Sequence, residues 1–118
     1  MGALYQELLS DLAHVQLPLA KTDYAENIYW VFGLVLSESV EINAVDAILQ
    51  LKNRGIGSRP FFCPMHRQPI LKRLNYFQSD IHPISDRLYD RGFYIPSGIA
   101  LTDSEIRHVA STVRAILS

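Results

Sequence analysis

The sequence predicts an α+β fold, a small antiparallel or mixed sheet flanked by helices. The first observation is the run from Ile28 to Leu36, which is rich in aromatic and β-branched residues and has the length of a strand. The second is a shorter strand signal from Phe93 to Pro96, where the proline stops the strand. The third is helical spacing of apolar residues in the segments around these strands. The 118 residues can bury one modest core and contain no repeat or linker, so we expect a single domain spanning 1–118.

The first element is a helix from Ala3 to Leu12, with leucines 4, 8, 9 and 12 on one face. No capping residue precedes it, so we expect it to continue a longer helix. An irregular connection follows from Leu17 to Asn27 and contains Pro18. The strand Ile28–Leu36 is apolar on both faces, which predicts a central strand covered on both sides.

The next helix runs from Asn43 to Arg54. Asn43 caps it, and its buried stripe is predicted to be residues 45, 48 and 49. Gly55 ends it in the left-handed conformation. One or two helical turns are expected from Ile70 to Leu74, before an irregular segment over 75–82.

Two helices complete the chain. One runs from Pro83 to Arg91 and ends at Gly92. The other begins at a capping box, Thr102-Asp-Ser-Glu105, with Leu101 able to pack on Ile106. Its apolar stripe comprises Ile106, Val109, Ala110, Val113, Ile116 and Leu117.

Composition narrows the class of protein. The chain is 48% hydrophobic and 19% charged, with a net charge of −1, so it offers no basic surface for nucleic acid or for a membrane. Its longest apolar stretch has the length of a strand, and no signal peptide is visible. A single cysteine, Cys63, excludes an internal disulfide and agrees with a reducing compartment. We expect a cytoplasmic protein.

The loop from Gly55 to Pro69 carries the strongest functional signal. Two glycines allow a tight backbone path, and three prolines stiffen it. Arg59 and His66 lie on this stiffened segment. Arg59 has two interpretations, an ordinary surface arginine or a contact to phosphate or carboxylate, which a planar guanidinium suits. His66 is either a structural histidine bonded to the backbone or a contact to a ligand.

Two other interpretations of this region are weaker. Cys63, His66 and His82 make half a zinc site at most, so no metal is expected and Cys63 is read as an inert core residue. Four aromatic residues are interpreted as core rather than as a platform for nucleobases, because no basic groove accompanies them: Tyr29, Trp30, Phe61 and Phe62.

The segment Arg59-Pro-Phe-Phe-Cys-Pro-Met-His66-Arg-Gln-Pro69 resembles the arginine–aromatic–Pro–x–His–x–Gln–Pro signature of the DegT/StrS family. Members are pyridoxal-phosphate-dependent aminotransferases that act on nucleotide-linked keto-sugars. The helix start, the aromatic strand and the ending Tyr94-Ile-Pro-Ser-Gly98 follow the order of the family's C-terminal domain. The ending is similar to the perosamine-synthase-like branch, whose substrates are GDP-linked 4-keto sugars such as GDP-4-keto-6-deoxy-mannose.

The resemblance implies the C-terminal small domain of a fold-type I aminotransferase, the last third of a longer enzyme whose N-terminal pyridoxal-phosphate-binding domain is absent. It implies that His66 lies where the small domain approaches the active-site cleft, and that Tyr94 and Ser97 lie near that cleft. The predicted substrate-binding residues are therefore Arg59, His66, Tyr94 and Ser97. An ordinary strand end remains an equally good explanation for Tyr94 and Ser97.

The resemblance also implies what this chain lacks. The family's cofactor lysine follows a Ser-x-x-x-Lys pattern, which Lys21, Lys52 and Lys72 do not match. The glycine-rich phosphate cradle and the aspartate that pairs with the pyridinium nitrogen are not found either. We expect no catalytic or cofactor-binding residue in this chain and no turnover by it alone. Pyridoxal phosphate belongs to the other domain of the parent enzyme.

Three partners are expected: the N-terminal domain, a nucleotide-sugar substrate, and a second copy that packs on leucines 4, 8 and 12 or on one face of the strand Ile28–Leu36. An alternative function stays open. A fold of this size also serves as a stand-alone α+β module that binds a ligand or a protein without catalysis.

Overall fold

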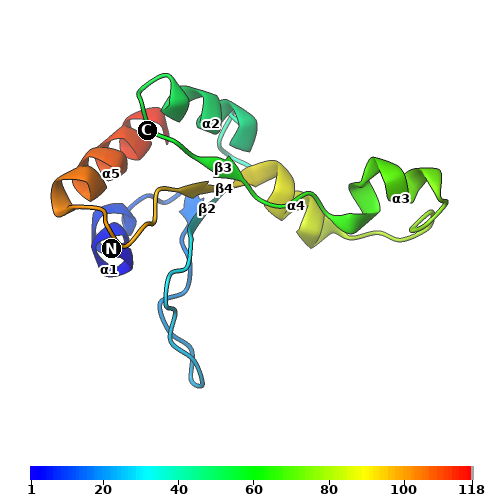
Figure 1. Cartoon of the computed structure of the whole chain (residues 1–118), viewed down its shortest axis with the longest axis horizontal. Coiled ribbons are helices and arrows are strands. Elements are labelled where there is room, and N and C mark those ends of the chain that lie inside the picture. Colours follow the sequence, from blue (N-terminus) through cyan, green and yellow to red (C-terminus); the bar gives the residue numbers. More distant parts are fainter. Residues whose placement is uncertain (118) are drawn as a thin grey trace.

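The computed structural model describes residues 1–117 and confirms the predicted α+β class (Figure 1). Four strands form one sheet in the order β1-β2-β4-β3, and every neighbouring pair is antiparallel. The elements follow the chain as α1 (Gly2–Leu9), β1 (Val15–Gln16), β2 (Phe32–Leu36), α2 (Ala44–Lys52), β3 (Arg59–Pro60), the 3-10 helix η1 (Met65–Arg67), α3 (Pro69–Arg73), α4 (Pro83–Arg91), β4 (Gly92–Ile95) and α5 (Asp103–Leu117).

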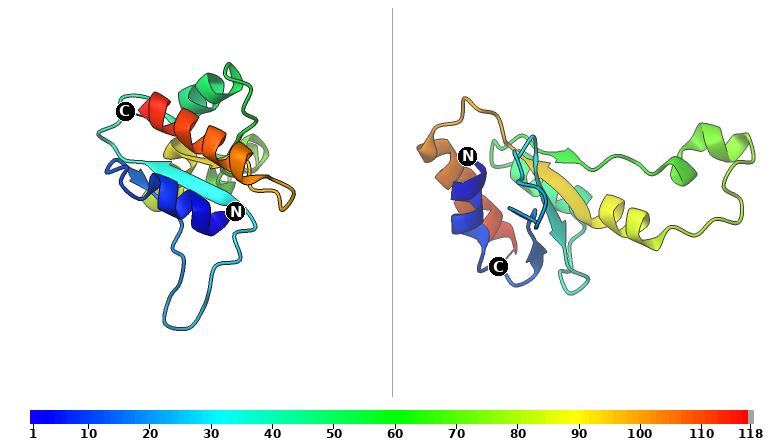
Figure 2. Two further views of the ribbon diagram at one scale, coloured as in Figure 1. Left: turned by 90° about the vertical axis from the view of Figure 1, so that its left-hand side faces the viewer. Right: turned by 90° about the horizontal axis from the view of Figure 1, so that it is seen from below.

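The hydrophobic core lies on one face of this sheet. Side chains alternate along a strand, so the residues of β2 and β4 that point to this face are Phe32, Leu34, Leu36, Phe93 and Ile95, all of them buried. They pack in one cluster with buried residues of α1, α2 and α5. Figure 2 shows α1 and α5 side by side on the same side of the sheet.

The opposite face of the sheet, called the outer face below, is covered differently. Gly33 of β2 and Gly92 of β4 belong to this face, and the ring of Phe61 occupies the space above both glycines. The predicted covering of β2 on both sides is therefore correct, because the Phe61 ring and helix α4 both lie against this face, where Val35 of β2 is buried. This arrangement leaves the outer face shallow and open to ligands beside Phe61.

The structure corrects the predicted start of the central strand. β2 begins at Phe32, four residues after Ile28. Tyr29 has a φ of 50°, and its backbone N–H donates to Asn27 Oδ1, so the chain turns before it enters the sheet. Trp30 consequently lies in the connection with 75% of its surface exposed, and its predicted place in the core is wrong.

The second helix forms as predicted but buries another face. Asn43 accepts a hydrogen bond from Asp46 N at 3.0 Å, and the Asp46 carboxylate accepts from Asn43 N, which completes a capping box. The buried residues are Ala44, Ala47 and Leu51. Val45 is 68% exposed. Of the predicted stripe, only Ile48 packs partly against the core, so the buried face of α2 is turned toward Ala44, Ala47 and Leu51.

The helices α1 and α5 pack against each other, and the leucines of α1 are partly covered by this packing. Arg114 of α5 donates to Asp11 and to the backbone oxygen of Leu8. Leucines 4, 8 and 12 are partly buried against the core, so the expected open surface for a second copy on this helix is wrong. Tyr5 is fully buried, and its hydroxyl donates to Pro96 O at 2.8 Å. Burial raises the pKa of Tyr5 to about 12.

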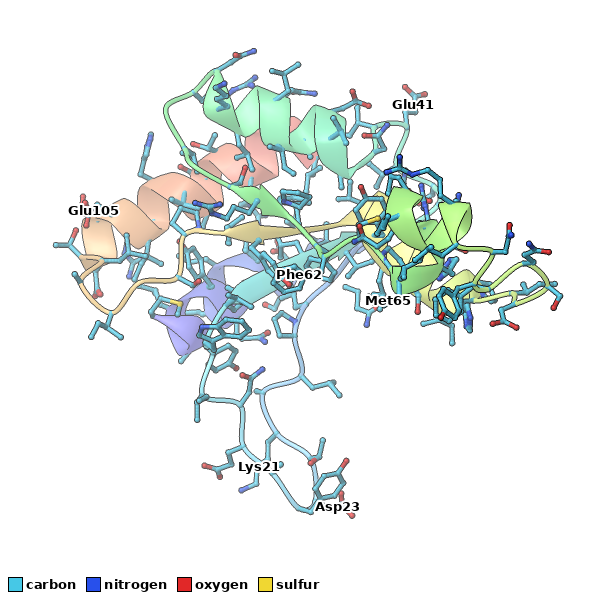
Figure 3. The ribbon with its side chains drawn as sticks, turned by 45° about the vertical axis from the view of Figure 1, so that its right-hand side comes forward. Lys21, Asp23, Glu41, Phe62, Met65 and Glu105 are labelled. Atoms are coloured by element: carbon cyan, nitrogen blue, oxygen red, sulfur yellow. The ribbon has the colours of Figure 1, made fainter. Side chains whose placement is uncertain are left out.

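Two segments project from the body of the domain (Figures 1 and 3). The first, residues 17–31, is a long hairpin that joins β1 to β2 and has Lys21 and Asp23 near its tip. The second, residues 62–82, carries η1 and α3 and is called the arm below. The radius of gyration is 15.6 Å, against about 13.5 Å expected for a compact chain of this length. The projections account for the difference.

Both projections display large apolar side chains. Phe62, at the base of the arm, is 77% exposed, so its predicted core position is wrong. Along the two segments the exposed residues include Leu19, Tyr24, Ile28, Met65, Ile70, Leu74, Tyr76 and Ile81. Within residues 1–117, no helix has the length and apolar character needed to cross a membrane.

Candidate functional site

Three of the four predicted site residues line one hollow on the outer face. Arg59, Tyr94 and Ser97 surround a space of about 610 Å3. His66 lies in a neighbouring hollow of about 640 Å3, and Tyr94 borders this one too. The structure thus brings all four residues to two adjoining hollows with Tyr94 as their shared wall.

Arg59 lies on the edge strand β3, where its backbone is paired with Tyr94. Residues paired in antiparallel strands project to the same face, so the arginine and the tyrosine both belong to the outer face. The guanidinium of Arg59 is exposed and makes no hydrogen bond or ion pair within residues 1–117. It is therefore available for an anionic ligand.

Ser58 is a neighbour that sequence reasoning missed. Its Oγ is buried and has no hydrogen-bond partner among the described residues, although it lines the same hollow as Arg59. A buried hydroxyl without a partner is costly, and a ligand oxygen in the hollow would remove that cost. No signal distinguishes Ser58 in the sequence, because its burial follows from how the loop folds against β4.

The position of Tyr94 is set by aromatic packing. Its ring stacks on Phe61 with the centroids 4.6 Å apart and an interplanar angle of 28°. The ring of Phe62 lies 6.4 Å from that of Tyr94, centroid to centroid, in an edge-on arrangement. The hydroxyl of Tyr94 makes no hydrogen bond within the described chain, so it remains available to a ligand.

Ser97 lies two residues after the end of β4, where the chain has left the sheet. The preceding residue, Pro96, is anchored by the Tyr5 hydroxyl from the core side. This bond holds the strand end in place and thereby positions Ser97 at the rim of the hollow.

His66 is held by the helix α4. Its Nε2 lies 2.8 Å from Asp86 Oδ1, and the imidazole is only 13% exposed. As a structural histidine, His66 was predicted to bond to the backbone, but its partner is the carboxylate of Asp86. The hydrogen bond to His66 lowers the pKa of Asp86, and the nearby charge of Arg67 acts in the same direction.

Arg67 forms a second link between η1 and α4. Its Nη1 lies 2.8 Å from both carboxylate oxygens of Asp90 and 3.5 Å from Asp86 Oδ1. The guanidinium also stacks over Tyr89, 4.7 Å from the ring centroid. The hydrogen bond to Asp90 raises the pKa of Arg67. The base of the arm is therefore fastened to α4.

The two aspartates of α4 were missed by sequence reasoning, although a signal existed. Asp86 and Asp90 are four residues apart in a helix, so they share one face, where like charges repel. Such a pair predicts a cation nearby, and η1 supplies the guanidinium of Arg67.

The region around Cys63 has no metal-binding geometry. His66 and His82 have ring centroids 4.8 Å apart. Within residues 1–117, however, the His, Cys, Asp and Glu side chains do not gather in any group of three that could hold a metal. Cys63 is half-buried at the edge of the hollow, and its thiol contacts Pro64 O at 3.8 Å. It is a lining residue, and the prediction that it belongs to the core is wrong.

Comparison with protein families matches residues 1–114 to the DegT/DnrJ/EryC1/StrS aminotransferase family. The chain belongs to this family. The match covers both hollows, the arm and nearly the whole of α5. It confirms the resemblance that the segment from Arg59 to Pro69 indicated.

Individual relatives agree with the family. The GDP-perosamine synthase of Vibrio cholerae is 28% identical over 86 residues, which cover 73% of this chain and 23% of that protein. The aminotransferase TlmJ from Streptoalloteichus hindustanus has the same fold, with a TM-score of 0.81 and 22% identity over 98% of this chain and 30% of its own. DesI, solved in the presence of its TDP-sugar product, has a TM-score of 0.76 and 26% identity, and the match covers 97% of this chain and 29% of DesI. The chain thus spans less than a third of each relative.

The residues present do not fit a covalently bound pyridoxal phosphate. Lys21 lies near the hairpin tip, ion-paired with Glu26 at 2.8 Å. Lys52 and Lys72 are exposed on α2 and α3. No lysine lines either hollow of the outer face. A family member needs a lysine beside the cofactor phosphate site, and neither hollow offers that combination.

Proposed function

We propose that this chain acts as the C-terminal small domain of a pyridoxal-phosphate-dependent aminotransferase that transfers an amino group to a nucleotide-linked keto-sugar. In this proposal the domain supplies contacts to the substrate, and a separate N-terminal domain holds the cofactor and its lysine. One observation carries the proposal: in a chain of this family, Arg59, Tyr94 and Ser97 converge on one open hollow.

Arg59 is assigned to the anionic part of the substrate. Its guanidinium has no partner within residues 1–117, and a planar fork of donors suits the oxygens of a phosphate. The buried Ser58 hydroxyl gives the same hollow a second polar group. A nucleotide sugar carries such phosphates between its base and its sugar.

Tyr94, Ser97 and His66 are assigned to the polar groups next to the phosphates. Their hydroxyl and imidazole groups border the two adjoining hollows, which together are large enough for a ligand that bridges them. The stacked rings of Phe61 and Tyr94 give the ligand a rigid apolar floor. None of these residues breaks or forms bonds in the proposal; they orient the substrate.

The substrate class follows from the relatives. One curated relative is named GDP-perosamine synthase, and DesI was solved with a TDP-sugar product. We therefore favour a GDP-linked or TDP-linked sugar, with GDP-4-keto-6-deoxy-mannose as the first candidate.

The domain organisation is also part of the proposal. The hairpin and the arm expose apolar side chains that this chain leaves uncovered, among them Trp30, Phe62 and Ile81. A surface of this kind suits a partner. We assign it to the cofactor-binding portion of the enzyme, with a second copy of the enzyme as a further partner. We also propose a cytoplasmic location, which agrees with the single, free cysteine of this chain.

Binding of GDP and GDP-mannose to the isolated chain tests the proposal by two-dimensional amide NMR. Added GDP should shift the amide signals of Gly57, Ser58 and Ser97, with a millimolar dissociation constant because the chain holds only part of the cleft. Arg59→Ala should weaken GDP binding by roughly tenfold to a hundredfold, since a hydrogen bond to a charged group contributes about 1.5–3 kcal/mol.

The matched control is Arg107→Ala. Arg107 is an exposed arginine of α5 that lines neither hollow, so its removal changes net charge equally and should leave GDP binding unchanged. If Arg59→Ala and Arg107→Ala weaken GDP binding equally, the effect comes from the net charge of the chain and not from a contact of Arg59 with GDP. Shifts confined to the arm, with none near Arg59, would favour the stand-alone module and overturn the assignment of the hollow.

A further inference from the structure

The carboxylate of Asp86 and the imidazole of His66 form a pair that sequence reasoning did not anticipate. The Nε2–Oδ1 distance is 2.8 Å, and the imidazole is largely buried. The two residues come from different elements, η1 and α4, so the contact depends on how the arm leaves the sheet. A bond of this length between an imidazole and a carboxylate is well formed.

This bond decides which ring nitrogen carries the proton. An ionised carboxylate can only accept hydrogen bonds, so Nε2 must be the donor. In the neutral imidazole, Nδ1 then carries the lone pair. Within residues 1–117, Nδ1 makes no hydrogen bond, and His66 lines the larger hollow together with Tyr94.

The surroundings keep Asp86 in place. Arg67 bonds mainly to Asp90 and reaches Asp86 at 3.5 Å, so the carboxylate faces a fixed positive charge as well as the imidazole. The ring of His82 lies 4.8 Å from that of His66, and Tyr89 lies beneath the Arg67 guanidinium.

We propose that Asp86 is the positioning residue for His66: it fixes the ring and its proton on Nε2, so that Nδ1 faces the hollow as an acceptor for a hydroxyl or amino group of the substrate. The proposal rests on the proposed function, because it assumes that His66 contacts the substrate. The assignment adds a residue from α4 to a site otherwise built from β3, β4, the segment after β4 and η1. It also explains why the base of the arm is fastened at this point. Asp86 itself touches no substrate.

The test reads the tautomer of His66 from long-range nitrogen–proton NMR spectra of the full chain at about pH 8.5, above the usual titration range of histidine. A His66→Gln variant identifies the signals among the four histidines. The Nε2–H form should exceed the Nδ1–H form by roughly tenfold or more, because the bond to a charged acceptor is strong. Asp86→Ala should reduce this ratio several-fold.

Asp90→Ala is the matched control, since it removes a carboxylate from the same face of α4 and leaves the bond to His66 in place. It should preserve the His66 tautomer. The proposal is overturned if His66 of the wild type carries its proton on Nδ1 or averages between the two tautomers. This result can be read even if Asp86→Ala fails to fold. An equal change in both aspartate variants also overturns it, because the effect would then arise from Arg67.

Added GDP-mannose separates this proposal from the proposed function. A shift of the His66 Nδ1 signal in the wild type, reduced several-fold in Asp86→Ala, is the result we expect. If the wild type holds the Nε2–H form but GDP-mannose shifts no His66 signal while it still perturbs Ser58, the role of His66 as a substrate contact fails, and with it the functional part of this proposal. The assignment of Arg59 would survive that result.

Discussion

Gly92 is the position where the structure predicts the sharpest response to a small substitution. It lies at the junction of α4 and β4 with a φ of −104° and a ψ of 141°, a conformation open to any residue. The requirement for glycine is therefore one of space. A Cβ atom at this position would lie 2.3 Å from Leu88 O and 2.6 Å from the nearest ring atom of Phe61.

The loss of stability in Gly92→Ala depends on which atoms must move to make room for the added Cβ. Leu88 O is a backbone atom in the last turn of α4, so Gly92→Ala must shift the helix relative to the strand as well as the Phe61 ring. Overpacking of this kind costs about 1–3 kcal/mol, and the backbone contact favours about 2–3 kcal/mol. For a domain of this size that corresponds to a fall in Tm of about 8–12 °C.

Two other glycines provide controls. At Gly33 the added Cβ would lie 2.9 Å from the tip of the Phe61 ring, and its nearest neighbours are side-chain atoms rather than backbone, so we expect a smaller cost of about 1 kcal/mol. At Gly98 the added Cβ meets nothing within 4 Å, and Gly98→Ala should leave stability unchanged or raise it by about 0.4–1 kcal/mol.

Urea unfolding and thermal melting, followed by far-ultraviolet circular dichroism, measure all three variants. The expected order of stability is Gly98→Ala, then Gly33→Ala, then Gly92→Ala. If Gly92→Ala unfolds within about 0.5 kcal/mol of the wild type, the close approach of α4 and β4 described here is wrong. A loss at Gly98 as large as that at Gly92 would mean that glycine content, rather than space, sets the stability.

Three further predictions concern the core, the carboxylates and the cofactor. Tyr5→Phe removes a buried hydroxyl and leaves Pro96 O unpaired, so urea unfolding should show a loss of about 1–3 kcal/mol; an unchanged midpoint would contradict the bond. The pKa of Asp86 and that of Glu105 are lowered by hydrogen bonds to His66 and to Thr102 respectively. Both groups therefore stabilise the fold above the ordinary carboxyl pKa and lose this contribution as the pH falls below about 4.5, so urea midpoints should decrease with acidification; midpoints that rise would refute this sign. Pyridoxal phosphate followed by borohydride should give no stoichiometric modification of one lysine, and peptide mapping that finds one would overturn the assignment of the cofactor to another domain.

Local signals in the sequence predicted several elements well. The helix α4 has the predicted bounds, Pro83–Arg91, because proline at its start and glycine after its end act through the backbone alone. The capping box at Thr102 forms, with Glu105 accepting hydrogen bonds from the Thr102 N–H and hydroxyl. Gly55 has the predicted left-handed conformation, with a φ of 76°. Each of these features depends on residues within one or two turns.

Other features depend on contacts that sequence patterns do not contain. The strands β1 and β3 have only two residues each, too few for a period of two to be visible, and they exist because β2 and β4 offer partners. The buried face of α2 was predicted to be residues 45, 48 and 49, whereas the packing of the helix buries Ala44, Ala47 and Leu51.

The candidate site divides in the same way. The sequence by itself indicated the fold class and the family, because short motifs carry that information locally, and it proposed Arg59 and His66 from the stiff loop and Tyr94 and Ser97 from the family resemblance. Only the tertiary structure decided that three of these residues share one hollow while His66 is held by Asp86 in the next. These relations join residues from different elements, up to 38 positions apart between Arg59 and Ser97. They form only when β3 pairs with β4 and when the arm is fastened to α4, since strand register and helix packing set such distances.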